Sequence, residues 1–138
     1  MLCDLLLSVL LLFFVAITSS AAPTTLAKTQ IVCNPHITSP KKYAKWAMGS
    51  THNVTWDIIN IPPEKISSRG VLLLGHGSRS NENLNISHPL ATDFPINHGW
   101  VSVTVPHGIE PRSDYMIVLF GDSGNVSPPF HVVHEMRY

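Results

Sequence analysis

The sequence predicts an all-β domain, built as an antiparallel β-sandwich of about seven strands. The first observation is that 11 Pro and 8 Gly are spread through the 138-residue chain after residue 22, which leaves no room for an amphipathic helix. The second is that short runs of β-branched and aromatic residues recur between clusters of turn-forming residues. The third is the alternation of apolar and polar residues in His52–Ile59, which is the period of a half-buried strand.

The first half of the chain contains three expected strands, each bounded by turn residues. The first, Gln30–Ile37, includes Asn34-Pro35, which an edge strand tolerates because proline cannot donate to a ladder. The second, Tyr43–Ala47, is short and lies between two turns. The third is His52–Ile59, whose residues expected to face the core are Val54, Trp56 and Ile58.

The second half of the chain contains further short strands separated by loops. Val71–Leu74 is a continuous apolar run between two glycines, as expected of a buried strand. Tyr115–Phe120 is apolar on both faces, so we expect it at the centre of a sheet. The other strands are expected within Asn85–Phe94 and at Trp100–Val105 and Phe130–His134, with loops at His76–Leu84 and Gly121–Pro129.

The position of one tyrosine narrows the type of sandwich. Tyr115 begins the predicted central strand shortly after the loop residue Ile109, which resembles the tyrosine corner of immunoglobulin-like and fibronectin III-like sandwiches. Cys3 lies in the apolar N-terminal segment, so Cys33 has no partner for an internal disulfide. We interpret Cys33 either as a small buried hydrophobe or as half of an intermolecular bridge. Because the antibody disulfide is missing, the fibronectin type is favoured.

The N-terminus indicates export. Leu5–Ile17 is an apolar run followed by the small residues of Thr18–Pro23, the pattern of a secretory signal peptide. We therefore expect a signal peptide at residues 1–21, a short leader at 22–29 and a single sandwich domain at 30–138. Asp4 stands where a positive charge is usual, which leaves a retained N-terminal anchor as the alternative. No second apolar stretch of spanning length follows, so we expect a secreted protein without a transmembrane span.

The charge balance excludes one class of partner. The chain has 9 Lys and Arg against 9 Asp and Glu, and only 13% of its residues are charged. Nucleic-acid binding needs a basic surface, so no nucleic-acid partner is expected.

A set of ordered motifs along the chain is similar to one known domain. The motifs are Ile37-Thr-Ser-Pro40, Trp46-Ala-Met-Gly-Ser50, Asn53-Val-Thr-Trp56, Trp100-Val-Ser-Val-Thr-Val-Pro106, Asp114-Tyr-Met-Ile-Val-Leu-Phe120 and Ser127-Pro-Pro-Phe130. Their order resembles the N-terminal domain of fungal cell-wall β-glucan assembly proteins of the Kre/Knh type, which also occurs in Ser/Thr-rich glycosylphosphatidylinositol-anchored surface proteins. The resemblance implies a secreted fungal sandwich domain that acts at the cell wall without catalytic residues. The stalk, the anchor signal and the C-terminal region of that family are missing, which puts a direct part in glucan synthesis in doubt.

Three sequons are candidate glycosylation sites in an exported chain: Asn53, Asn85 and Asn125. Asn85 lies in a polar segment, and Asn53 is on the expected outer face of its strand. Asn125 is followed by Ser127-Pro128, and a nearby proline hinders use of a sequon.

Exposed aromatic rings are the candidate contacts for a bound glycan, because the C–H face of a pyranose is apolar. We single out Trp100, which follows a glycine at a strand start, and Trp46. Packing in the core is the alternative for both rings.

No pattern of catalytic or metal-binding residues stands out. The chain has 8 His, but none forms a compact ligand motif, and the carboxylates are scattered. We therefore expect no metal, no cofactor and no enzymatic activity. The interpretation is a secreted, non-enzymatic cell-wall or cell-surface protein that binds a wall polysaccharide or a surface protein. A small secreted effector that binds a host protein is the first alternative, and a metal-dependent secreted enzyme is the second.

Overall fold

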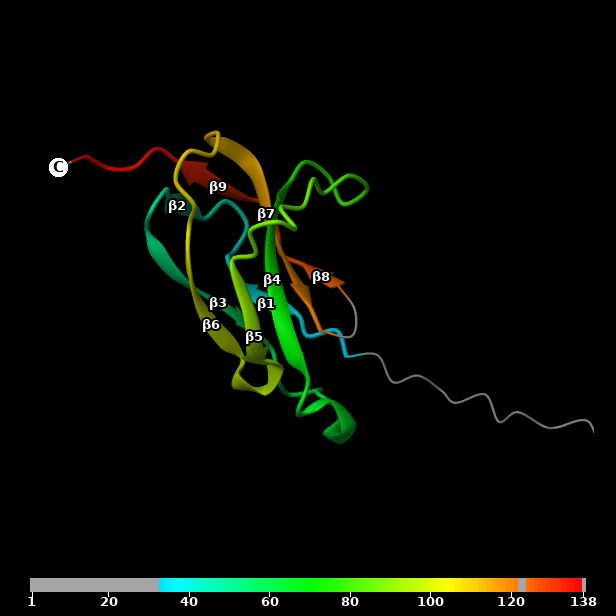
Figure 1. Ribbon diagram of the computed structural model, residues 1–138. Helices are drawn as coiled ribbons and strands as arrows, with labels where there is room; N and C mark the ends of the chain where they lie inside the picture. The colour runs from blue at the N-terminus through cyan, green and yellow to red at the C-terminus, as the bar shows by residue number, and fades with distance from the viewer. Residues whose placement is uncertain (1–32, 122–123, 138) are drawn as a thin grey trace, which may run out of the picture.

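Two β-sheets packed face to face make up the structure, a computed structural model that describes residues 33–121 and 124–137 (Figure 1). The smaller sheet has the order β1-β3-β6, with strands β1 (Ile37–Ser39), β3 (Thr51–Trp56) and β6 (Trp100–Thr104). The larger sheet has the order β2-β9-β7-β4-β5, with strands β2 (Lys45–Ala47), β9 (Phe130–Val133), β7 (Arg112–Phe120), β4 (Arg69–His76) and β5 (Ala91–Pro95). The predicted all-β sandwich is confirmed, whereas the predicted signal peptide and leader lie outside the described residues.

The strands number nine in the described residues, where about seven were expected. After β7 the chain forms two strands where one was expected: β8 (Gly124–Val126) and β9 both pair with β7, on the side opposite β4. Pro128 and Pro129 separate the two pieces, because proline has no N–H to continue the ladder. β2 pairs with β9 in parallel, and the other ladders are antiparallel.

The core forms between the sheets from the alternate residues that the sequence pattern indicated. Val54 and Trp56 are buried, and the indole Nε1 of Trp56 donates a hydrogen bond of 2.7 Å to the carbonyl of Ile96. The prediction for Ile58 was wrong: this side chain is 45% exposed. The strand ends at Trp56, and the next amide, that of Asp57, bonds the carbonyl of His36 instead of continuing the ladder.

The predicted boundaries hold best for the most apolar strands. β4 and β7 pair along their whole shared length, and residues 116–119 of β7 are buried on both faces, as expected of a central strand. Residues 33–36, expected in the first strand, are not in a strand, and β8 lies within the predicted loop Gly121–Pro129. Helical structure in the described residues is confined to two short 3-10 turns, η2 (Pro63–Lys65) and η3 (Ile96–His98), neither of which has the length to cross a membrane.

The tyrosine corner is present. The hydroxyl of Tyr115 donates a hydrogen bond of 2.7 Å to the carbonyl of Glu110, five residues back along the chain. This bond ties the connection between β6 and β7 to the start of β7 and thereby fixes one wall of the pocket described next.

Candidate functional site

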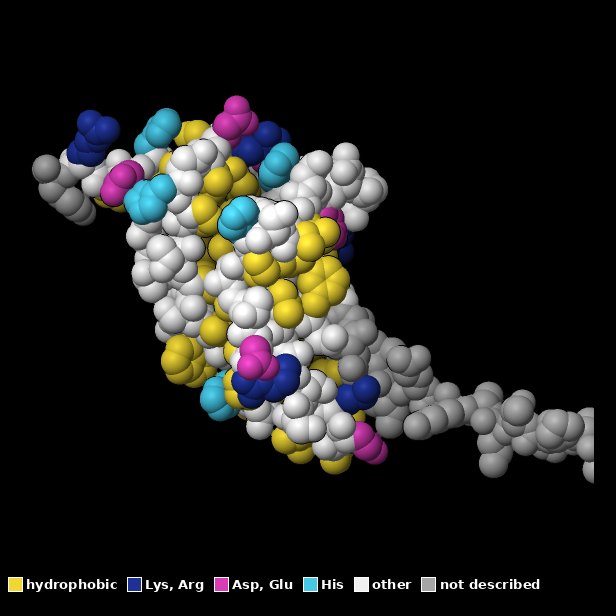
Figure 2. Space-filling view, in the orientation of Figure 1, with side chains coloured by type: hydrophobic (Ala, Val, Ile, Leu, Met, Phe, Trp, Pro, Cys, Tyr) yellow, Lys and Arg dark blue, Asp and Glu magenta, His cyan; other side chains and the backbone are white. Residues whose placement is uncertain are grey.

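A pocket of about 260 Å³ opens at the end of the sandwich where β4 finishes and β7 begins. Histidine, acidic and basic side chains gather at this upper end of the molecule (Figure 2). The lining residues come from β4, the loop after it, the connection between β6 and β7, and the start of β7: Leu74, His76, Asn83, Asn85, Ile109, Glu110, Arg112 and Tyr115. The elements that meet here are far apart in sequence, so the pocket depends on the complete fold.

The apolar floor and the imidazole follow from the period of β4. Leu74 faces the core, and His76, two residues on, lies on the same side of the strand. The register pairs His76 with Tyr115, and the two rings meet edge to face with centroids 5.9 Å apart. The Nδ1 atom of His76 is buried and has no hydrogen-bond partner among the described residues. A buried polar atom left unpaired costs about 1–3 kcal/mol.

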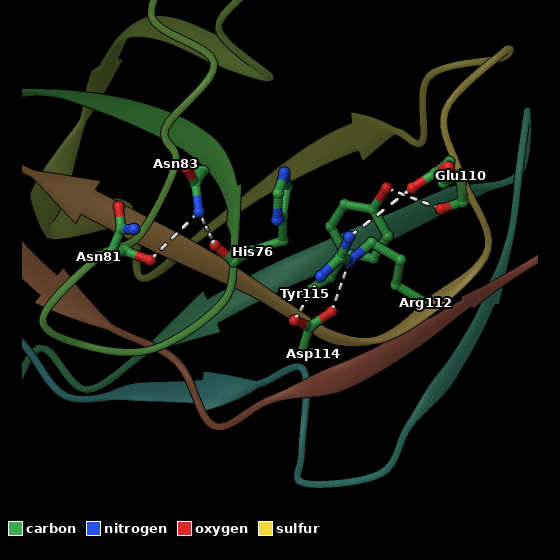
Figure 3. Close-up of polar contacts among 7 residues, drawn as sticks. All are labelled: His76, Asn81, Asn83, Glu110, Arg112, Asp114 and Tyr115. Carbon is green, nitrogen blue, oxygen red and sulfur yellow. Dashed lines mark hydrogen bonds and ion pairs between the residues drawn. The ribbon is translucent and has the colours of Figure 1, made fainter.

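The loop wall is held against the end of β4 by hydrogen bonds (Figure 3). The amide Nδ2 of Asn83 donates to the carbonyls of His76 at 3.0 Å and Asn81 at 3.3 Å. The backbone amide of Asn85 bonds the carbonyl of Leu74 at 2.9 Å. The side chains of Asn83 and Asn85 therefore stand at fixed positions along the rim.

The opposite wall carries a compact ion pair (Figure 3). Arg112 donates from Nε and Nη2 to the two carboxylate oxygens of Asp114, at 2.7 and 2.9 Å, and its Nη1 lies 3.6 Å from Glu110. This hydrogen bonding lowers the pKa of Asp114 and raises that of Arg112 above its usual value. Arg112 thus has two carboxylates beside it, which compensate its positive charge.

The chemistry of the pocket suits the binding of a neutral polar ligand. Its walls offer amide, imidazole and carboxylate groups around an apolar floor, the combination typical of small-molecule sites.

Other polar residues lie outside this pocket. The hydroxyl groups of Ser78 and Ser80 are hydrogen-bonded to each other at 2.9 Å. Asp57 lines a different pocket, beside Cys33 and His36. Cys33 itself is buried.

The two predicted glycan-contacting tryptophans lie in different environments. Trp46 is only 6% exposed and packs in the core, stacked on His52 at 4.3 Å and against Phe130. The prediction that Trp46 contacts a glycan was therefore wrong, because its ring has no free face. Trp100 is 53% exposed at the start of β6.

The outer face of the smaller sheet surrounds Trp100 with uncharged side chains. The register places Thr51 opposite Thr104, Asn53 opposite Ser102, and Thr55 opposite Trp100. None of the three strands of this sheet contains Lys, Arg, Asp or Glu. The result is a hydroxyl-rich and amide-rich surface with a single exposed indole.

The three sequon asparagines also differ in environment. Asn53 is exposed on the outer face of β3, and Asn85 is exposed at the rim of the pocket. Asn125 is half-buried, its Nδ2 donates to the carbonyl of Pro35, and Ser127 of the same sequon is 2% exposed.

Sequence reasoning missed most of the pocket. It placed His76 in a polar loop, and it gave no role to Asn83, Glu110 or Arg112. One signal was available: Arg112 and Asp114 are two residues apart on a strand and therefore on one face, where opposite charges pair. No local sequence pattern predicts that the loop after β4 folds back onto this strand.

No family model, curated protein or solved structure matches the chain. The resemblance to the Kre/Knh-type domain therefore stays a prediction from the sequence. The described residues contain no group of three or more His, Cys, Asp or Glu side chains that could hold a metal ion.

Proposed function

We propose that the chain is an exported, non-catalytic binding module of the fungal cell wall or cell surface, and that its end pocket binds one sugar residue of a wall glycan. The observation that carries the proposal is the pocket itself: polar groups of His76, Asn83 and Glu110 surround a floor of Leu74 and Tyr115. A sugar ring presents hydroxyl groups at its rim and C–H groups on its faces, which is the complementary arrangement.

The size of the pocket supports a single ring as the ligand. Its volume of about 260 Å³ is just below the roughly 300 Å³ at which drug-sized pockets begin. A chain end or a branch of a polysaccharide fits such a site better than an extended stretch of backbone does.

The electrostatics of the pocket support binding without chemistry. Glycoside hydrolysis needs two opposed carboxyl groups, one of which has a raised pKa and acts as the acid. The pKa of Asp114 is lowered instead, and both Asp114 and Glu110 are engaged with Arg112.

Retention on insoluble β-glucan and chitin tests the pocket with the variant His76→Phe. Phenylalanine keeps the ring contact with Tyr115 and removes both ring nitrogens, including the unpaired Nδ1. We expect unchanged or higher thermal stability, and about tenfold weaker retention for the loss of about 1.4 kcal/mol of hydrogen bonding.

The matched control is His98→Phe, which changes an exposed histidine in η3 that does not line the pocket. We expect this variant to bind like the unchanged protein. Undiminished retention of a folded His76→Phe protein would contradict the pocket as the site. Binding of a host or surface protein in place of either polysaccharide would favour the effector alternative.

A further inference from the structure

We propose that Asn53 carries an N-linked glycan whose first N-acetylglucosamine packs on the indole of Trp100. The exposed ring of Trp100 then contacts a glycan attached to the same chain. The inference rests on the export part of the proposed function and is independent of the pocket. In the transfer, Nδ2 of Asn53 loses a proton and bonds to C1 of the sugar. The bond from C1 to the diphosphate of a lipid-linked oligosaccharide donor breaks.

The strand register brings the two side chains to the same face. Asn53 pairs with Ser102 and Thr55 pairs with Trp100, so Trp100 is the diagonal neighbour of Asn53 across the β3–β6 ladder. Diagonal neighbours in an antiparallel pair lie about 7–8 Å apart, within reach of long or aromatic side chains. A sugar ring attached to Asn53 spans this distance.

The folded domain leaves room for a sugar on Asn53. Its side chain is exposed, and no hydrogen bond within the described residues engages its Nδ2 atom. The third residue of its sequon, Thr55, is tied only at the hydroxyl, 2.6 Å from that of Thr38. Asn125 offers the opposite case, since its Nδ2 is already bonded to Pro35.

The surface around Trp100 suits a covering sugar. The indole is 53% exposed on a sheet face that otherwise carries hydroxyl and amide groups and no charge. The apolar C–H face of a pyranose removes part of the indole from water, which is favourable in proportion to the area covered. The neighbouring Ser102 and Thr104 hydroxyls offer hydrogen-bond partners for the polar rim of the sugar.

A double-mutant cycle on the full chain, secreted from a glycosylating yeast, tests the proposal. The four proteins are unchanged, Asn53→Gln, Trp100→Ala and the double variant, and each is compared by glycopeptide mass and by thermal unfolding. We expect a glycan on Asn53 and a fall in Tm of about 4 °C or more for Asn53→Gln. In the Trp100→Ala background the same change is expected to have little effect, because the sugar has lost its platform.

Removal of a different sequon, by Ser87→Ala in both Trp100 backgrounds, is the matched control and is expected to change Tm equally in the two. An unmodified Asn53 in the secreted protein would overturn the proposal. So would an equal fall in Tm for Asn53→Gln in the presence and in the absence of Trp100. Neither result touches the pocket, which the His76→Phe experiment tests by itself.

Discussion

Ser127 belongs to a glycosylation motif, but its side chain makes hydrogen bonds that stabilise the fold. Its hydroxyl accepts a hydrogen bond from the amide of Ile117 and donates one to the carbonyl of Pro128, both at 2.9 Å. Its sequon partner Asn125 bonds the carbonyl of Pro35. These contacts hold the junction between β8 and β9 against β7. A glycan on Asn125 is incompatible with them, so we expect this asparagine to be unmodified in the folded protein.

Replacement of Ser127 by alanine leaves the buried amide of Ile117 without its side-chain acceptor. We expect Ser127→Ala to lower the free energy of unfolding by about 1–3 kcal/mol, measured by urea denaturation. Ser67→Ala, at an exposed serine before β4, is the control and is expected to stay within about 0.5 kcal/mol of the unchanged protein. A loss as small as that of the control would show that Ser127 is not a structural residue.

His52 gives the fold a dependence on pH. Burial against Trp46 lowers the pKa of His52, so the folded protein holds it neutral below the ordinary value of about 6.5. Between the lowered pKa of His52 in the folded protein and its ordinary pKa in the unfolded chain, the unfolded chain binds more protons. The contribution of His52 to stability is therefore fully present above about pH 6.5 and is lost as the pH falls. We expect His52→Phe, which keeps the ring stack, to flatten the fall in Tm between pH 7.5 and 5. An identical pH profile for the two proteins would contradict this assignment.

The tyrosine-corner hydrogen bond of Tyr115 connects β7 to the loop that forms one wall of the pocket. Tyr115→Phe removes the hydrogen bond to the carbonyl of Glu110, for which we expect a loss of about 0.5–1.5 kcal/mol in unfolding free energy. Because the same bond holds the loop that forms a pocket wall, retention on the glycan is expected to weaken as well. Tyr43→Phe, at a ring that is 63% exposed, serves as the control in both measurements. Unchanged retention would show that the loop does not depend on the corner.

At the scale of elements, the sequence predicts strands well where burial is continuous. β4 and β7 are read directly from their apolar runs because both of their faces are covered. The sequence did not predict β8, because Gly124–Val126 has the composition of a turn. These residues form a strand because the neighbouring edge of β7 is available for pairing. The pocket was not predicted for a related reason. Its lining combines residues 74–85 with residues 109–115, and no local sequence pattern indicates that these two segments come together.

At the scale of the whole molecule, the proposed pocket and the Asn85 sequon share one residue. This side chain lines the pocket, and its Oδ1 accepts a hydrogen bond of 3.2 Å from the amide of His88. A glycan on Nδ2 would therefore stand over the mouth of the pocket. We expect glycosylation of Asn85 and occupation of the pocket to exclude each other.

Ser87→Ala removes this sequon without changing Asn85 itself, and we expect the secreted variant to be retained more strongly on the glycan ligand than the unchanged protein. Thr55→Val, which removes the Asn53 sequon on the outer face of the smaller sheet, is expected to leave retention unchanged. Equal retention of the unchanged and Ser87→Ala proteins, with a glycan on Asn85 established by peptide mass, would count against the pocket as the binding site.

The position of β9 between β2 and β7 delays completion of the larger sheet until late in translation. β9 lies between β2 and β7, so the larger sheet is incomplete until the ribosome has translated residue 133. On the proposed export route, we therefore expect the nascent chain to present Asn53 and Asn85 before the sandwich has closed around them. We expect sugars on these two asparagines to be attached before the final folding step, so that the domain completes its fold with them already in place.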